Sequence, residues 1–151
     1  GIDALRAGKP ILTDTNMART GIRKQDARHF GVAVICHMDD PGVHAAALSA
    51  GTTRAEAAVD AALAEMTDGI YVIGNAPTAL LRLIEQVRCG RARPALIIGL
   101  PVGFVNAAES KAALAELGHP FITNAGRKGG SNVAAAVVNA LLLLAQEKET
   151  E

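Results

Sequence analysis

Residues 70–90 of the chain read IYVIGNAPTALLRLIEQVRCG. This segment opens on four apolar residues, passes through a turn that contains Gly74, and then carries a helical pattern from Pro77 to about Arg88. Proline suits the first turn of a helix, where its missing N–H is not needed, and Gly90 stands just past the expected end. The segment therefore predicts a buried strand, a short turn and a helix.

The same alternation of short apolar runs with helical stretches extends along the chain. The runs show no alternation of apolar and polar residues, which is typical of strands buried on both faces of a sheet. Strands that alternate with helices predict right-handed βαβ units and an α/β fold, a three-layer α/β/α sandwich with a mainly parallel sheet. The expected strands are Pro10–Leu12, Val32–Cys36, Ile70–Ile73, Ala95–Leu100 and Phe121–Thr123, and the expected helices are Thr53–Met66, Pro77–Arg88, Asn106–Leu117 and Ser131–Gln146.

Length and charge restrict the class of protein. The chain has 151 residues, which suit a single domain over residues 1–151, and half of them are hydrophobic, which excludes disorder. Its 15 basic and 15 acidic residues balance, which excludes a general nucleic-acid binder and a polybasic membrane patch. The two cysteines fit reduced thiols and a cytoplasmic location.

The last expected helix is the one segment with a membrane-like composition. Residues 129–145 carry no charge, but they include Ser131, Asn132, Asn139 and many alanines. A membrane span needs about 20 predominantly apolar residues. We therefore expect a buried helix or one that lies in a subunit interface.

Three glycine-bearing turns follow expected strands, at residues 74–78, 99–104 and 126–131. In a parallel sheet, ligands bind at the carboxyl ends of strands, where free backbone N–H groups and helix N-termini favour anions. The third turn adds the cations Arg127 and Lys128, and it lacks the spacing of a nucleotide P-loop. The alternative is that these glycines only make tight turns.

Two residues at expected helix starts are further candidates. Asp14 follows the first strand, and its spacing favours a cap on the next helix, with the orientation of a partner or a substrate amide as the alternative. Arg54 follows a capping-box threonine, Thr53, at a position where a cation opposes the helix dipole. That conflict favours a role for Arg54 in pairing with a ligand carboxylate.

The four histidines do not form a recognised site. His29, His37 and His44 have no zinc-ligand spacing with Cys36, so no metal is expected. His119 precedes a strand and is expected at the surface. No Ser/His/Asp set can be assembled from order and spacing.

At these turns the chain resembles the precorrin-8X methylmutase family, also called precorrin isomerase, with its cobalt-precorrin-8 counterpart. The resemblance runs from Gly1 to the last helix, with the strings in the expected order. The matching strings are Pro10–Met17, Gly21–Ile22, Val34–Cys36, Asp40–Pro41, Thr53–Arg54, Gly74–Leu80, Gly99–Val105, Ala108–Lys111 and Gly126–Ser131.

The resemblance implies an α/β/α sandwich, a homodimer with active sites near the interface, and a cobalamin-biosynthesis isomerase without a cofactor. The reaction moves a methyl group from ring carbon 11 to ring carbon 12 of precorrin-8X or cobalt-precorrin-8, which gives hydrogenobyrinic or cobyrinic acid. The partner is thus a carboxylate-rich tetrapyrrole. The substrate-binding residues that we expect are Thr13, Asp14, Met17, Thr53, Arg54, Asn75, Ala76, Pro77, Thr78, Val102, Gly103, Phe104, Arg127, Lys128, Gly129, Gly130 and Ser131.

The chain departs from the family pattern at the catalytic histidine, which acts as proton donor and acceptor on the macrocycle. In the family this histidine lies before the first matching string, and none of the four histidines here stands in its motif. We therefore expect an N-terminally truncated member that is inactive alone, with Arg54, Arg127 and Lys128 pairing with carboxylates. The alternatives are a non-catalytic corrinoid-binding module and a phosphate- or nucleotide-binding α/β domain.

Overall fold

The computed structural model describes residues 1–147, so the last four residues of the expected domain lie outside the described part. Helices and strands alternate along the chain as the sequence predicts. The helices are α1 (Ile2–Arg6), α2 (Asn16–Gly21), α3 (Lys24–His29), α4 (Pro41–Ala50), α5 (Arg54–Ala61), α6 (Pro77–Arg88), α7 (Ala107–Ala115) and α8 (Ser131–Glu147), and the strands are β1 (Ile11–Thr13), β2 (Val34–Ile35), β3 (Ile70–Ile73), β4 (Leu96–Gly99) and β5 (Phe121–Thr123).

The strands form one five-stranded sheet in the order β2-β1-β3-β4-β5, and every pair is parallel. β3 pairs with β1 through Ile70 and Ile11, and with β4 through Ile70 and Leu96. The order reverses direction between β1 and β3, which is the switch point at which doubly wound folds bind ligands. The expected α/β class with a parallel sheet is confirmed.

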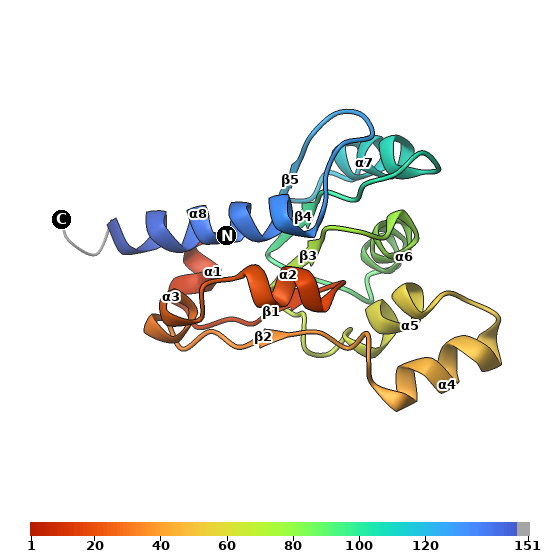
Figure 1. Ribbon diagram of the computed structural model, residues 1–151, viewed down its shortest axis with the longest axis horizontal. Coiled ribbons are helices and arrows are strands. Elements are labelled where there is room, and N and C mark those ends of the chain that lie inside the picture. Colours follow the sequence, from red (N-terminus) through yellow and green to blue (C-terminus); the bar gives the residue numbers. More distant parts are fainter. Residues whose placement is uncertain (148–151) are drawn as a thin grey trace.

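Helices cover both faces of the sheet (Figure 1). On one face, α1, α2, α3 and α8 pack against strand residues such as Ile70 and Val72; on the other, α5, α6 and α7 pack against Tyr71 and Ile73. All four residues of β3 are buried because successive side chains enter opposite cores. This explains why the strand sequences lack alternation of apolar and polar residues.

Several helix boundaries differ from the expectation. α5 ends at Ala61 rather than Met66, because the chain must turn to bring Met66 into the core and Gly69 to the start of β3. Asp68 makes this reversal with a positive φ of 61°. α7 begins after Asn106, whose φ of 62° is not helical, and ends at Ala115.

α8 lies along one face of the molecule with an apolar inner side (Figure 1). Ala134, Val138 and Leu142 are fully buried against the sheet and against α1 and α2, whereas Leu143 and Leu144 remain partly exposed. Among residues 1–147, no helix is long and apolar enough to cross a bilayer. The expected buried character of this helix is confirmed for its inner side.

Candidate functional site

Asp14 connects the carboxyl ends of β1 and β3. Its Oδ1 accepts a hydrogen bond from the N–H of Gly74, and its Oδ2 accepts one each from Asn75 and Ala76, all at 2.9 Å. The next helix is capped by Thr15 instead, so the expected capping role of Asp14 was wrong. The same bonds consume three N–H groups of the β3–α6 turn, which is therefore not the open anion site that the sequence predicted.

Burial sets the electrostatics of this carboxyl group. Asp14 is 1% exposed, and burial raises its pKa above the ordinary value, while the three N–H donors oppose that rise by stabilising the carboxylate. A buried carboxylate that accepts three backbone hydrogen bonds fixes the conformation of the segment that donates them. Asp14 thus determines the path of the β3–α6 turn and has no exposed oxygen to offer a ligand.

The β5–α8 turn folds back over the ends of the other strands. The N–H of Gly130 donates to the carbonyl of Leu100 at 3.0 Å, and the hydroxyls of Thr15 and Ser131 lie 2.7 Å apart. Gly74 has to be glycine, since a Cβ there would come within 2.6 Å of the Cα of Ser131. The turns after β1, β3, β4 and β5 therefore form one connected surface at the carboxyl edge.

Lys111 of α7 lies beneath the β5–α8 turn. Its side chain is buried, and its ammonium donates to the carbonyls of Gly126 and Lys128, the former at 3.0 Å. The carbonyl between them, that of Arg127, accepts from the N–H of Gly103 at 3.2 Å. Burial lowers the pKa of Lys111. The sequence did not indicate a role for Lys111, because nothing in the string AESK shows which segment its side chain reaches.

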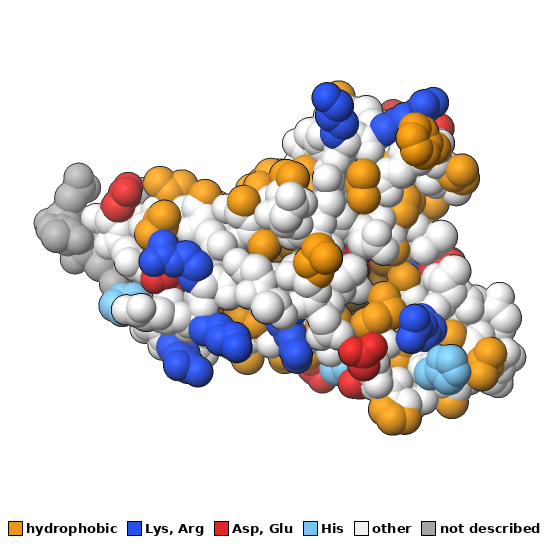
Figure 2. All heavy atoms as spheres, in the orientation of Figure 1, with side chains coloured by type: hydrophobic (Ala, Val, Ile, Leu, Met, Phe, Trp, Pro, Cys, Tyr) orange, Lys and Arg blue, Asp and Glu red, His pale blue; other side chains and the backbone are white. Residues whose placement is uncertain are grey.

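Apolar side chains stand exposed at this edge beside the cations. Phe104 is 85% exposed, and the guanidinium of Arg127 lies 5.8 Å from the centre of its ring. Val105 (76%), Met17 (70%) and Val102 (42%) are also exposed. Figure 2 shows hydrophobic and basic side chains close together over the β4–α7 and β5–α8 turns. A contiguous apolar patch with polar groups around it is typical of a binding surface.

Thr53 and Arg54 lie at the start of α5, on the β2 side of the connected surface. The expected capping box is present, and the hydroxyl of Thr53 lies 3.4 Å from that of Thr78 at the start of α6. Arg54 is exposed and makes no ion pair with any described residue. The predicted site residues divide by burial: Thr13, Asp14, Gly130 and Ser131 are buried, Ala76, Pro77, Thr78, Gly103 and Gly129 are half-buried, and Met17, Thr53, Arg54, Asn75, Val102, Phe104, Arg127 and Lys128 are exposed.

Histidines and cysteines do not gather at this edge. Within residues 1–147, no three His, Cys, Asp or Glu side chains are placed to hold a metal ion. Cys36 is half-buried and Cys89 exposed, both as thiols. His119 is half-buried rather than a surface residue, and a ring nitrogen lies 2.7 Å from the carbonyl of Pro94, which holds the turn before β5.

His37 joins two segments that enclose the end of β2. Its Nδ1 lies 2.5 Å from a carboxylate oxygen of Asp40, and its Nε2 lies 3.0 Å from one of Glu65. Burial alone lowers the pKa of His37, but the two hydrogen bonds and the charges of both carboxylates outweigh it, so the pKa is raised above 6.5. Because the pKa is raised in the folded state, the pairing of protonated His37 with the two carboxylates stabilises the fold. This stabilisation is complete below pH 6.5 and is lost as the pH rises through the folded-state pKa.

We predict that His37→Gln destabilises the protein only where His37 is protonated. Both carboxylates are about half exposed, so the loss should be about 1 kcal/mol at most. Urea unfolding of the wild type and the variant, at about pH 6 and about pH 9, measures the difference. The difference in the free energy of unfolding should shrink at the higher pH. His44→Gln, on the exposed face of α4, is the matched control. A difference that grows with pH would contradict this assignment.

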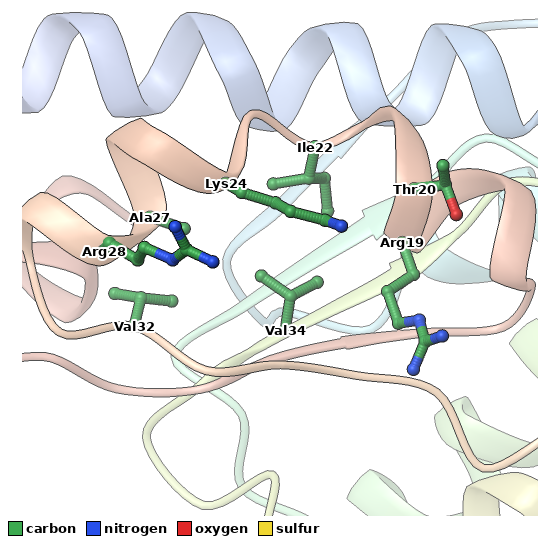
Figure 3. A pocket seen from close by; sticks show the side chains of 8 residues that line it. All are labelled: Arg19, Thr20, Ile22, Lys24, Ala27, Arg28, Val32 and Val34. Atoms are coloured by element: carbon green, nitrogen blue, oxygen red, sulfur yellow. The ribbon is translucent and has the colours of Figure 1, made fainter.

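A cavity of about 370 Å³ lies between α2, α3 and β2 (Figure 3). Basic side chains surround an apolar floor that is continuous with one of the two cores. The sequence did not predict this cavity, because it gave no bounds for α2 and did not indicate α3. The cavity is lined by Arg19, Thr20, Ile22, Lys24, Ala27, Arg28, Val32 and Val34.

Comparison with known proteins identifies relatives over nearly the whole chain. The sequence profile of a family described as "Precorrin-8X methylmutase" matches residues 1–144. A cobalt-precorrin-8 methylmutase of Priestia megaterium is 48% identical over 150 residues, which are 99% of this chain and 67% of that protein. Its counterpart in Salmonella typhimurium is 51% identical over 93% of this chain and 65% of its own length. The chain thus spans about two thirds of the length of the curated relatives it matches.

Solved structures agree with the sequence comparison. The precorrin-8X methylmutase of Thermus thermophilus superposes with a TM-score of 0.87 at 43% identity, covering 97% of this chain and 72% of that one. A precorrin-8X methylmutase related protein gives a TM-score of 0.84 at 31% identity, covering 94% and 76%. Fold, sequence profile and the glycine-bearing turns therefore agree: the chain belongs to the precorrin-8X methylmutase family.

Proposed function

We propose that the carboxyl edge of the sheet binds a corrin precursor for methyl migration from ring carbon 11 to ring carbon 12. The substrate would be precorrin-8X or cobalt-precorrin-8, and the product hydrogenobyrinic or cobyrinic acid, in cobalamin biosynthesis. The observation that carries the proposal is the combination of exposed apolar side chains with unpaired cations on one edge. Membership of the family supports it.

The chemistry of the edge suits such a ligand. A corrin precursor has an apolar ring system with acetate and propionate side chains around it. Met17, Val102 and Phe104 offer apolar surface to the ring, while Arg127 and Lys128 offer positive charge to carboxylates. A few placed cations achieve this in a protein whose formal net charge is zero.

The role of these residues in the reaction is to bind and orient the macrocycle. An intramolecular shift gains from a site that holds one geometry and excludes water. None of the four histidines is assigned as the proton donor, and both ring nitrogens of His37 are engaged by carboxylates. The second candidate is a corrinoid-binding module without turnover, because the groups described at this edge are binding groups.

Arg127→Ala should lower the affinity for hydrogenobyrinic acid by about tenfold, the usual loss for one charge-assisted contact. Titration followed by visible absorption, at one ionic strength, measures the dissociation constant. Arg91→Ala is the matched control, because Arg91 is exposed between α6 and β4, at the opposite edge of the sheet. Equal affinity of Arg127→Ala and wild type would contradict the role of Arg127.

The same titration separates the candidate functions. Addition of precorrin-8X should give the spectrum of the product if the chain is an isomerase, and a bound but unconverted spectrum if it is a binding module. Saturable binding of ATP or inorganic phosphate with no binding of corrinoid would contradict both.

We also propose a homodimer that buries the outer side of α8. Val133, Leu143 and Leu144 are each between 43% and 46% exposed there, and such apolar area favours an interface. Sedimentation equilibrium of the wild type and of Leu143→Glu tests this, since the charge should shift the chain to monomer. A wild type that stays monomeric would contradict the proposal.

A further inference from the structure

We infer that Lys111 is a positioning residue that turns the backbone of the β5–α8 turn toward a carboxylate of the ligand. The inference rests on the proposed function, because it concerns the same edge of the sheet. It adds a residue that contacts no ligand and acts from beneath the turn. Three observations support it: the direction of the carbonyls in the turn, the N–H groups of the same turn that donate to no described group, and the surroundings of Lys111.

The carbonyls of three successive residues in the turn accept hydrogen bonds from within the protein. Lys111 Nζ donates to those of Gly126 and Lys128, and the N–H of Gly103 donates to that of Arg127. The side-chain amide of Asn124 adds a second bond to the carbonyl of Lys128 at 3.0 Å. All three carbonyls are thus turned toward Lys111 and the β4–α7 turn.

The N–H groups of the same peptide units must point the other way. No peptide bond among residues 1–147 is cis, and in a planar trans peptide the C=O and the following N–H are antiparallel. The N–H groups of Arg127 and Gly129 are therefore directed away from Lys111, and that of Lys128 is directed away from Gly103. None of them donates to another described group. Successive N–H groups that face outward form a concavity for an anion, and here the side chains of Arg127 and Lys128 flank it.

The surroundings of Lys111 indicate that the ammonium serves the turn rather than the core. Lys111 is 2% exposed, and three of its neighbours around an adjoining cavity are Ala108, Ala112 and Ala115. Taking an ammonium out of water costs several kcal/mol unless it is paired, and an apolar side chain would fill this space without that cost. No carboxylate within the described chain pairs with it. Its recorded partners are the two carbonyls of the turn.

The test compares Lys111→Met with Lys111→Arg. Methionine keeps the unbranched side chain as far as its Cε and removes the ammonium with its donors, so the affinity for hydrogenobyrinic acid should fall by about tenfold, as for loss of a charge-assisted contact. Arginine restores the donors, and the cavity of about 300 Å³ beside Lys111 gives room for the larger guanidinium. Lys111→Arg should therefore bind within about threefold of wild type.

A double-mutant cycle shows whether Lys111 acts through the turn. Arg127→Ala should cost about tenfold in the wild type but less than about threefold in Lys111→Met, because residues that act together are not additive. Gln86→Met is the control for a merely structural loss. Gln86 is equally buried, in α6, and donates to Asp60 at 2.6 Å without contacting the turn, so this variant should lose stability but keep its affinity.

The outcomes separate this inference from the proposed function. A folded Lys111→Met chain that binds as tightly as wild type, or a Lys111→Arg chain as weak as Lys111→Met, overturns the positioning role and leaves the proposed function standing. A wild type that binds no hydrogenobyrinic acid overturns the proposed function and this role with it. If Lys111→Met fails to fold, the cycle is run with Lys111→Gln, and additive losses in that background overturn the inference.

Discussion

Asp14→Asn should lower the free energy of unfolding by about 3 kcal/mol, because buried backbone N–H groups lose their acceptor. The carboxylate accepts three backbone N–H bonds with two oxygens. An asparagine amide has one oxygen, and its NH2 group would face a backbone N–H at 1% exposure, where water cannot replace the acceptor. The Gly74–Ala76 turn should then loosen, so ligand affinity should fall as well.

Urea unfolding measures this loss, and Asp68→Asn is the matched control. Asp68 is exposed, and its one recorded salt bridge is a 3.9 Å pair with Lys9. Its φ of 61° suits asparagine, which adopts the left-handed region readily. The control should therefore change stability by less than about 0.5 kcal/mol. Equal losses in the two variants would show that Asp14 has no special role in the turn.

Gly129→Ala should destabilise the protein by about 2–3 kcal/mol and weaken corrinoid binding. A Cβ at Gly129 would lie 2.6 Å from the carbonyl oxygen of Pro101 and closer still to that of Leu100. Both are backbone atoms and cannot rotate away, so the β5–α8 turn must move off the β4–α7 turn. That shift would carry Arg127 away from Phe104 and disturb the outward N–H groups.

Gly42→Ala is the control for an added methyl group. A Cβ there has no neighbour within 4 Å, and Gly42 lies in the first turn of α4, where alanine is the better helix former. The control should be neutral or stabilising by up to about 1 kcal/mol. Thermal unfolding monitored by circular dichroism, with the titration of hydrogenobyrinic acid, measures both effects. An unchanged melting temperature and affinity in Gly129→Ala would mean that the contact between the two turns is unimportant.

Local patterns predicted the elements that local forces determine. The β3–turn–α6 segment, the capping box of Thr53 and Glu56, and the start of α8 at Ser131 lie where the sequence indicates. In each case a signal within a few residues, such as Pro77 at a first turn, decides the conformation. The bounds of α2 and the whole of α3 were missed, because six residues carry too little periodicity to be recognised.

The candidate site was predicted as a place rather than as a set of contacts. Glycine-bearing turns after parallel strands were expected to meet at one edge, and those after β3, β4 and β5 do. The partners of Asp14 were not predictable, because the N–H groups that donate to its carboxylate are 60 to 62 residues away in the sequence. Nor was the role of Lys111, whose carbonyl partners lie 15 and 17 residues further along, on another element.

The sequence by itself determined the class of fold, the family and the edge at which chemistry is expected, because these depend on the period of apolar residues and on strings of adjacent residues. The tertiary structure alone decided which polar groups are used internally and which are left without an internal partner. Asp14 takes up the N–H groups of the first turn, whereas Lys111 and Gly103 take up the carbonyls of the third and leave its N–H groups outward. The physical reason is that a buried polar group must find a partner, and only the packed fold determines which partner is within reach.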